Sequence, residues 1–329
     1  MFKLPSAVVR FFEEKVGWHR FGVALSFTII GVAAFVLYRK LQGISVSKVV
    51  QAMTTVEYRD VLLAALCVAI GYGTLTFYDL FALRTIGRKE VPYRVAALAG
   101  FTSYAVGHNV GASVFTGGAV RYHIYSSWGL NAVEVAKICF IAGLTFWLGN
   151  AAILGLGITY EPWAAADVNQ LPVWFNRGIG IVGLLVLFSY IAWVWRTPRM
   201  IGRHNWQVRL PGGPLTLLQV VLGIFDMGSC AVAMYMLVPN EPQLDFVAVS
   251  VVFVSATLLG FLSHSPGGLG VFDAAMLIAL SEYDAEELLA GLLIFRLLYY
   301  ITPFMIALMI LGSRELILSV ARRRKIPGK

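Results

Sequence analysis

The chain has 329 residues, of which 58% are hydrophobic and only 13% are charged, and its mean hydropathy is +0.75. A soluble globular protein cannot bury so much apolar surface, so this composition excludes that class and predicts an all-α polytopic membrane protein. The formal net charge is +8, but the basic residues flank apolar segments instead of forming a face for nucleic acid. We therefore expect the membrane, with its anionic headgroups, as their partner.

Six apolar segments each come near the ~20 residues that a helix needs to cross a bilayer. They are 21–38, 60–83, 133–158, 177–196, 214–238 and 287–312. Two further segments, 95–128 and 246–281, are apolar but are interrupted by glycine-rich stretches at 107–118 and 263–270. Unwound backbone at membrane depth needs polar surroundings, so these segments are predicted to be re-entrant helical hairpins that meet at a binding site near the midplane.

The charges of the loops predict the orientation. Arginine and lysine concentrate in the 84–94 and 196–209 loops and at the C-terminus, whereas the 159–176, 239–245 and 281–287 loops are acidic. The positive-inside rule then places both termini in the cytoplasm of a bacterial cell inner (plasma) membrane.

This orientation also predicts two inverted-topology repeats within one membrane domain, residues 1–329. The first repeat, 21–158, contains the hairpin at 95–128, and the second, 177–312, contains the hairpin at 246–281. The helix after each hairpin is expected to begin with an N-cap residue, Asn131 in the first repeat and Asp284 in the second. Chance spacing in a polytopic protein is the alternative.

Charged residues inside the predicted spans are candidates for function. Asp226 lies near the centre of 214–238 and Arg296 lies within 287–312; each costs on the order of 3 kcal/mol at mid-bilayer if it is not compensated. Pairing of Asp226 with Arg296 is the arrangement with the lowest energetic cost. The pair could be purely structural, or one of the two residues could meet substrate or a coupling proton. Asp79 lies toward the cytoplasmic end of its span, where pairing with nearby Arg84 is a sufficient role and function is the alternative.

Each hairpin carries a charged residue shortly after a glycine pair. The pairs are Gly117 and Gly118 before Arg121, and Gly267 and Gly268 before Asp273. If the returning helices begin near these glycines, their N-terminal N–H groups are directed at the midplane. Arg121 then suits a phosphate and Asp273 suits a cation, which together match a phospholipid headgroup. The alternatives are that Arg121 extends to the interface and that Asp273 only caps its helix.

His108 and His264 lie at the start of the two breaks, but no carboxylate or cysteine stands at ligand spacing beside them. We therefore expect no metal and no cofactor. Hydrogen bonding to carbonyl groups freed at the breaks is the expected role of both histidines and of Asn109, with a proton relay as the alternative. The sequence carries no nucleotide-binding loop and no hydrolase motif, so catalysis is not expected.

The run Thr-Gly-Gly-Ala-Val-Arg-Tyr-His-Ile-Tyr-Ser-Ser-Trp-Gly-Leu at 116–130 resembles the flippase-type membrane domain of the multiple peptide resistance factor, a lysylphosphatidylglycerol synthase and flippase. Ser-Pro-Gly-Gly-Leu-Gly-Val-Phe-Asp at 265–273 supports the same resemblance, which covers roughly 20–312 and extends to stand-alone membrane relatives. It implies movement of aminoacylated phosphatidylglycerol to the outer leaflet, resistance to antimicrobial peptides, and roles for Arg121, Asp79, Asp226 and Asp273. The aminoacyl-transferase domain of that family has no counterpart in this sequence, so lipid synthesis is not expected.

The leading hypothesis is therefore a flippase-like lipid translocator that binds a headgroup phosphate at Arg121 and an amino group at Asp226 or Asp273. One alternative is a membrane subunit that recruits a separate aminoacyl-lipid synthase without transporting anything itself. An enzyme acting on lipid and an ion-coupled transporter of a small solute are the others. The expected partners are a phospholipid substrate and either a second copy of the chain or that synthase.

Overall fold

The computed structural model describes residues 44–203 and 206–324, together with scattered positions between 28 and 42. Within that part of the chain, five helical stretches are long and apolar enough to cross a membrane. They are α4 (Tyr58–Thr85), α7 (Ala132–Tyr160), α9 (Val173–Val194), α10 (Gly213–Tyr235) and the run Ala285–Ile317. The protein is therefore a multi-pass helical membrane protein, whereas the span predicted at 21–38 lies mostly outside the described residues.

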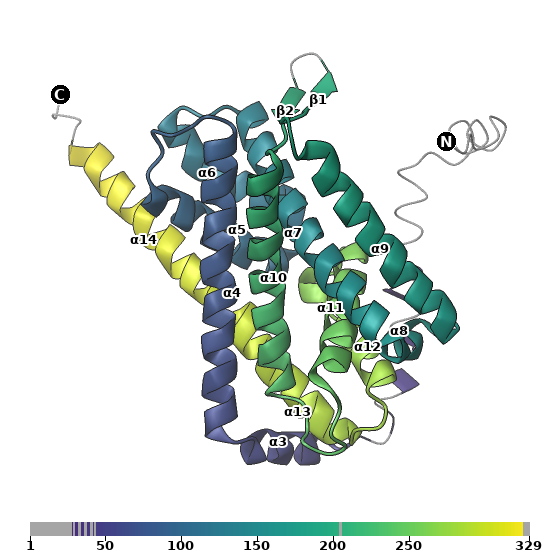
Figure 1. Ribbon diagram of the computed structural model, residues 1–329. Coiled ribbons are helices and arrows are strands. Elements are labelled where there is room, and N and C mark those ends of the chain that lie inside the picture. Colours follow the sequence, from purple (N-terminus) through teal and green to yellow (C-terminus); the bar gives the residue numbers. More distant parts are fainter. Residues whose placement is uncertain are drawn as a thin grey trace.

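Three short features lie in stretches that were predicted to be loops. Helix α3 (Val46–Thr55) and helix α8 (Pro162–Asn169) are short helices, and strands β1 (Met200–Arg203) and β2 (Trp206–Arg209) pair antiparallel. The small β-hairpin is an addition to a helical membrane protein, so the all-α prediction holds for the fold. The β-hairpin lies at one end of the helix bundle, here called the β end, and α3 lies at the other, here called the α3 end (Figure 1).

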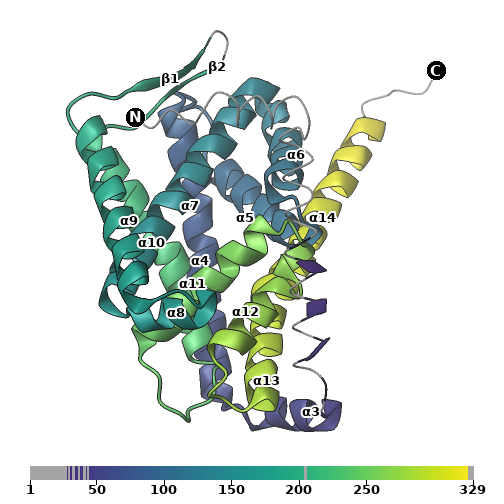
Figure 2. The same cartoon turned by 90° about the vertical axis from the view of Figure 1, so that its right-hand side faces the viewer.

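Each glycine-rich segment forms two helices whose outer ends lie at the same end of the bundle (Figures 1 and 2). The first hairpin is α5 (Tyr93–Val110), α6 (Ser113–Tyr125) and the turn η2 (Ser126–Trp128); the second is α11 (Phe246–Leu262), the turn η3 (Pro266–Gly268) and α12 (Val271–Ala279). The first opens toward the β end, where the guanidinium of Arg88, in the loop before α5, binds Glu134 in the first turn of α7 at 2.6 Å. The second opens toward the α3 end.

The tips of the two hairpins contact each other in the middle of the bundle. A Cβ atom added to Gly111, which has φ +83°, would lie 3.2 Å from the carbonyl oxygen of His264. Ala112 and His264 themselves have φ values of 47° and 56°, in the left-handed region that tight turns require. The break of each hairpin is therefore packed directly against the break of the other.

The position of the first break corrects one expectation. Helix α6 begins at Ser113, so Gly117 and Gly118 lie inside it and do not mark its start. Gly117 instead allows a close approach between α6 and α5, because a Cβ atom there would lie 3.0 Å from the carbonyl oxygen of Ser103. In the second hairpin the prediction is correct, since Gly267 and Gly268 lie in η3, just before α12 begins.

The run Ala285–Ile317 is not a uniform helix. Helix α13 (Ala285–Arg296) passes through a π-helical turn, η4 (Leu297–Ile301), into α14 (Thr302–Arg324). A π turn widens the helix and frees carbonyl groups. Here the hydroxyl of Tyr72 on α4 donates to the carbonyl of Tyr299, and the amide of Asn109 on α5 donates to that of Tyr300, each at 3.0 Å.

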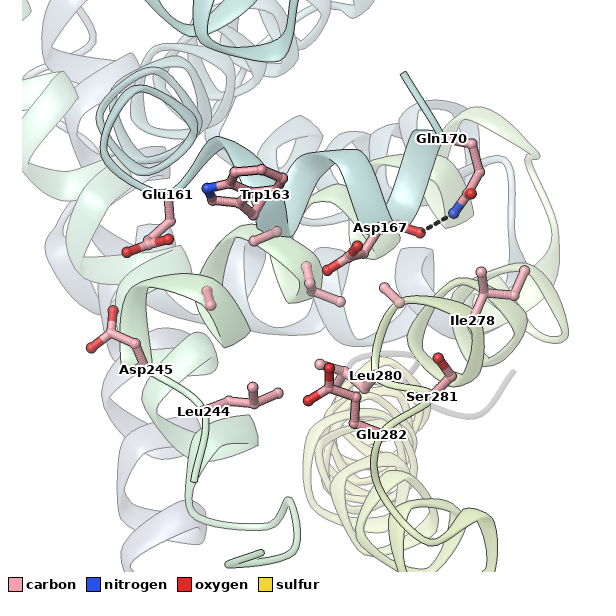
Figure 3. Close-up of a pocket in the computed structure, with 14 residues that line it drawn as sticks. Glu161, Trp163, Asp167, Gln170, Leu244, Asp245, Ile278, Leu280, Ser281 and Glu282 are labelled. Atoms are coloured by element: carbon pink, nitrogen blue, oxygen red, sulfur yellow. Dashed lines mark hydrogen bonds between the residues drawn. The ribbon is translucent and has the colours of Figure 1, made fainter. Parts of the chain in front are cut away.

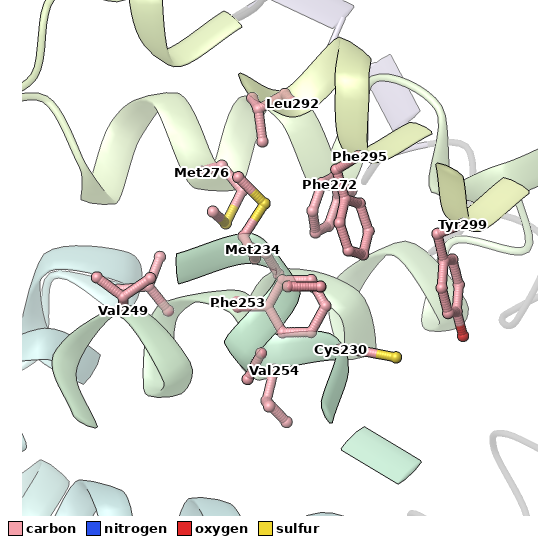
Figure 4. Close-up of a cluster of buried hydrophobic side chains, with 14 of the residues drawn as sticks. Cys230, Met234, Val249, Phe253, Val254, Phe272, Met276, Leu292, Phe295 and Tyr299 are labelled. Atoms are coloured by element: carbon pink, nitrogen blue, oxygen red, sulfur yellow. The ribbon is translucent and has the colours of Figure 1, made fainter. Parts of the chain in front are cut away.

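An aromatic cluster joins the second hairpin to α13 (Figure 4). The rings of Phe295 and Tyr299 stack with their centroids 5.3 Å apart, and Phe253 meets Phe272 edge-on at 5.9 Å. These four side chains come from α11, α12, α13 and η4, and each is at most 9% exposed. Packing of this kind fixes the position of the hairpin relative to the long helices.

Helices α7 and α10 cross at Gly149 and Gly223. A Cβ atom on Gly223 would lie 2.6 Å from the Cα atom of Gly149, and one on Gly149 would overlap the backbone of Gly223. Small residues at a crossing let two membrane helices approach at backbone distance.

The two predicted N-caps are confirmed. Asn131 accepts a hydrogen bond from the N–H of Glu134 at 3.0 Å and its own N–H donates back to the Glu134 carboxylate at 2.9 Å, which is a capping box. Asp284 accepts from the N–H groups of Glu286 and Glu287 at 3.0 and 3.1 Å.

We expect Asn131→Ala to lower the free energy of unfolding by about 1 kcal/mol, because the N–H of Glu134 at the start of α7 loses its side-chain acceptor. Asn131→Asp is the matched control, since an aspartate accepts the same bond. Denaturant unfolding in detergent micelles measures both variants. An equal loss in the two would show that the side-chain cap does not stabilise the helix.

Candidate functional site

A central cavity of about 220 Å³ lies where the hairpin tips meet. Its polar wall, apart from tyrosines and Cys139, consists of Ser103, His108, Ser113, Arg121, Thr257, His264 and Ser265. Its apolar wall includes Val114, Phe115, Phe146, Trp147 and Phe261. No carboxylate lies on this wall within the described residues.

Arg121 forms a buried ion pair with Asp79. Its Nε and Nη2 atoms donate to both carboxylate oxygens at 2.8–3.1 Å, and the hydroxyl of Tyr125 donates to Asp79 at 2.7 Å. Asp79 is 0% and Arg121 5% exposed. The guanidinium also lies over the ring of Tyr104, 4.7 Å from its centroid. Arg121 also lines the cavity, and its Nη1 atom takes no part in the bonds to Asp79.

This pair overturns one expectation, for Asp79, and one alternative, for Arg121. Asp79 does not bind Arg84, whose guanidinium instead donates to backbone carbonyls, including that of Lys89 at 2.7 Å. Arg121 does not extend to the interface either, because its side chain is buried against Asp79. The partner of Asp79 comes from a different helix, 42 positions further along the chain.

The second buried ion pair joins Arg296 to Asp273, with Nη2–Oδ2 at 2.6 Å and Nε–Oδ1 at 2.9 Å. Arg296 also donates to the carbonyl of Gly267 at 3.0 Å, in the break itself. Asp273 accepts from the N–H of Gly270 at 3.0 Å, so it caps α12 as well as binding the arginine. The predicted pairing of Arg296 with Asp226 is therefore wrong.

Asp226 accepts a hydrogen bond from the hydroxyl of Tyr78 at 2.9 Å and is 2% exposed. It does not lie on the wall of the central cavity, although the next residue, Met227, does. Asp273 does not lie on that wall either. The expectation that one of these carboxylates meets a headgroup amino group has no support in this arrangement.

The two histidines have different surroundings. His108 stacks on Tyr299 and lies tilted against Tyr104, with 5.7 Å between ring centroids in each case, and its Nδ1 has no hydrogen-bond partner among the described residues. His264 is exposed, with Nδ1 2.9 Å from the carbonyl oxygen of Leu262. Asn109 binds a freed carbonyl, as predicted, but the carbonyl belongs to Tyr300 in the π turn. Across the described part of the chain, no group of side chains is arranged to hold a metal ion.

Sequence reasoning missed the tyrosines around the site. Tyr78, Tyr104, Tyr125, Tyr299 and Tyr300 all contact a charged residue or the cavity. A tyrosine at helical spacing is usually a core residue, so the sequence gives little sign of this role. The adjacency of Tyr78 to Asp79 and the Tyr299–Tyr300 doublet beside Arg296 are the only signals it contains.

A second cavity, of about 350 Å³, lies near the α3 end between α8, the start of α11 and the end of α12 (Figure 3). Four carboxylates line it, those of Glu161, Asp167, Asp245 and Glu282, together with the indole of Trp163. These residues come from loops that were predicted to be acidic and external.

Residues 21–307 match the family described as the lysylphosphatidylglycerol synthase TM region. The chain belongs to this family. The match spans both hairpins and the central cavity, and it confirms the resemblance found in the sequence.

Relatives differ in how much of their length is matched. An uncharacterised protein of Synechocystis sp. is 29% identical over 260 residues, 79% of this chain and 80% of that protein. The inner membrane protein YbhN of Escherichia coli is 27% identical over 294 residues, 86% of this chain and 88% of its own length. A phosphatidylglycerol lysyltransferase of Staphylococcus aureus is 24% identical over 285 residues, 86% of this chain but only 32% of that enzyme.

Proposed function

We propose that this protein moves phospholipid between the leaflets of the bacterial inner membrane, with the headgroup in the central cavity. The observation that carries the proposal is the composition of that cavity. Arg121 provides a cation, and Oγ of Ser103 and Nδ1 of His108 have no hydrogen-bond partner among the described residues. All three residues lie beside an apolar wall. A phosphate fits the arginine, and acyl chains fit the apolar wall.

Exposure of the apolar wall supports a lipid substrate over a small polar solute. Val114 and Phe115, which line the cavity just beyond the first break, are 61% and 80% exposed. Side chains of this kind face hydrocarbon when the protein is in a membrane. A cavity with such a wall accepts an acyl chain from the side, whereas a site for a small polar solute needs no opening to hydrocarbon.

The cavity also suits the ammonium group of an aminoacylated phosphatidylglycerol. It has no carboxylate within the described residues, but the rings of Phe146, Trp147 and Phe261 line it. Aromatic faces attract ammonium ions, most strongly where water is excluded. We therefore assign the phosphate to Arg121 and the amino group to the aromatic wall.

The arrangement of the hairpins supports inverted repeats as part of the proposal. One hairpin opens toward the β end and the other toward the α3 end, and their tips meet. The β end, with basic Arg88 and Arg209 near it, faces the cytoplasm, and the α3 end, with Glu161 and Asp245, faces outward. Rocking of one repeat against the other would open the cavity to each leaflet in turn.

Gly143→Phe tests this function, because Gly143 lines the cavity and a Cβ atom there meets nothing within 4 Å. The phenyl ring would occupy the headgroup space without a backbone clash. We expect protein-dependent translocation of fluorescent lysylphosphatidylglycerol in proteoliposomes to fall roughly tenfold or more, the equivalent of about 1.4 kcal/mol or more of steric exclusion.

Gly73→Phe is the matched control, since Gly73 is an exposed helical glycine that also has open space around it. Phosphatidylglycerol without the lysyl group, assayed in parallel, tests the aromatic wall. Equal rates for both glycine variants would remove the cavity from the lipid path. No flux with folded wild-type protein would favour the alternative of a subunit that recruits a lipid-modifying enzyme.

A further inference from the structure

Asp226 differs from the other two buried aspartates within the described part of the chain. Asp79 and Asp273 each bind an arginine, but no lysine, arginine or histidine there lies within ion-pair distance of Asp226. One of its oxygens, Oδ2, accepts from Tyr78, and the other, Oδ1, has no hydrogen-bond partner among the described residues. Within the described residues, Asp226 is therefore a buried acid with one unpartnered oxygen and no counterion.

Among the described residues, the titratable groups that face Asp226 carry no positive charge. They are Tyr72 and Tyr78 on α4, Tyr104 on α5, Tyr299 on η4 and Cys230 on its own helix. From α7, α9, α11 and α13, which also pack against α10, the described residues contribute no charged group that acts on it. An ionised carboxylate in such surroundings is strongly disfavoured, and the neutral acid is the stable form.

Asp226 is also connected to the central cavity. The ring of Tyr78, its hydrogen-bond donor, lies edge-on to Tyr104 with centroids 6.2 Å apart. Tyr104 in turn lines the cavity and contacts both Arg121 and His108. A headgroup that displaces Tyr104 would therefore disturb the ring of Tyr78, which is the hydrogen-bond donor to Asp226.

The interface that encloses Asp226 lies between the two halves. A Cβ atom on Gly71 of α4 would lie 3.1 Å from Oγ of Ser229 and 3.2 Å from Sγ of Cys230 on α10. This close packing keeps water from Asp226 while the halves are in the arrangement seen here. Movement of α4 against α10 would break the Tyr78 bond and admit water to the free oxygen.

We propose that Asp226 is a proton-binding site that couples lipid movement to a proton gradient. In the closed arrangement it holds a proton. When the halves separate, the proton passes to water on one side of the membrane, and Asp226 takes a proton from the other side before the interface closes again. This inference rests on the proposed function for its coupling step, but the protonated state of Asp226 does not depend on it.

Infrared spectroscopy of the full chain in lipid nanodiscs tests the protonated state directly. At neutral pH we expect the C=O stretching band of a protonated carboxyl group, lost in Asp226→Asn and retained in Asp167→Asn, a variant of an exposed aspartate on α8. The asparagine variant is expected to fold, because its amide oxygen can still accept from Tyr78. A wild-type spectrum without a band that responds to Asp226→Asn would overturn the inference.

Proteoliposomes with an imposed pH difference test the coupling. With one proton per lipid, a gradient of one pH unit supports up to about a tenfold asymmetry of fluorescent lipid between leaflets, and Asp226→Asn is expected to abolish that asymmetry. If wild-type protein moves lipid but the pH difference produces no asymmetry between leaflets, the proposed proton coupling is wrong and the proposed lipid translocation still stands. Absence of any wild-type flux would instead overturn the translocator, and the infrared result would still decide whether Asp226 holds a proton.

Discussion

Replacing Arg121 with alanine is expected to lower the free energy of unfolding by about 3–5 kcal/mol, the range found when one partner of a buried ion pair is removed. Asp79 is 0% exposed and would be left without its cation. The hydroxyl of Tyr125, which donates to the same carboxylate at 2.7 Å, cannot neutralise that charge. The lost stability therefore comes more from the unpaired, buried carboxylate of Asp79 than from the missing contact with Arg121.

The double variant Arg121→Met with Asp79→Leu is the control, since it removes both charges and keeps apolar volume at both positions. We expect it to regain most of the lost stability and to bind headgroup phosphate poorly. Denaturant unfolding in micelles measures stability, and lipid translocation measures function. A loss below about 1 kcal/mol for Arg121→Ala would mean that water reaches the pair and that the site is not a buried one.

Substitution of Gly149 by leucine is expected to give the other large effect. The backbones of α7 and α10 are in contact at Gly149 and Gly223, so any side chain at this point forces the two helices apart. Overpacking typically costs about 1–3 kcal/mol, and a crossing at backbone distance lies at the upper end of that range or beyond it. The separation would also disturb the wall of the cavity, to which α7 contributes Gly143, Phe146 and Trp147.

Alanine variants on the same helices provide a graded test. Gly149→Ala and Gly223→Ala are expected to destabilise, whereas Gly143→Ala and Gly228→Ala meet nothing within 4 Å and are expected to be neutral or stabilising. Alanine is the better helix former by up to about 1 kcal/mol, which favours the two control variants. Thermal unfolding measures the stability of all four variants. Equal stability of the variants at Gly149 and Gly223 and of those at Gly143 and Gly228 would contradict this account.

Hydropathy and glycine placement predict the helices closely. The segment predicted at 133–158 is helix α7 (Ala132–Tyr160), and the two interrupted segments are helix–break–helix hairpins. A long apolar run leaves few alternatives to a helix in a membrane, and its ends follow from caps such as Asn131. Short amphipathic or polar elements give weaker signals, so α8 and the β1–β2 hairpin were predicted to be loops.

The partners of the buried charges could not be predicted in the same way. Asp79 is five positions from Arg84, which made a local pair plausible, but helix rotation directs it toward Arg121. Asp226 and Arg296 both lie mid-span, yet Arg296 binds Asp273. Which acid meets which base depends on the rotation and depth of each helix, and those are set by packing at sites such as Gly149 and Gly71.

The π turn at Leu297–Ile301 constrains how the last helix can move. Its two freed carbonyls, those of Tyr299 and Tyr300, are bound by side chains of α4 and α5, far away in the sequence. Rotation of α14 about its own axis, or a slide along it, breaks both bonds together, because the two carbonyls are consecutive. The final helix is therefore locked in register by the first half of the chain, and its displacement is a switch between discrete positions rather than a gradual drift.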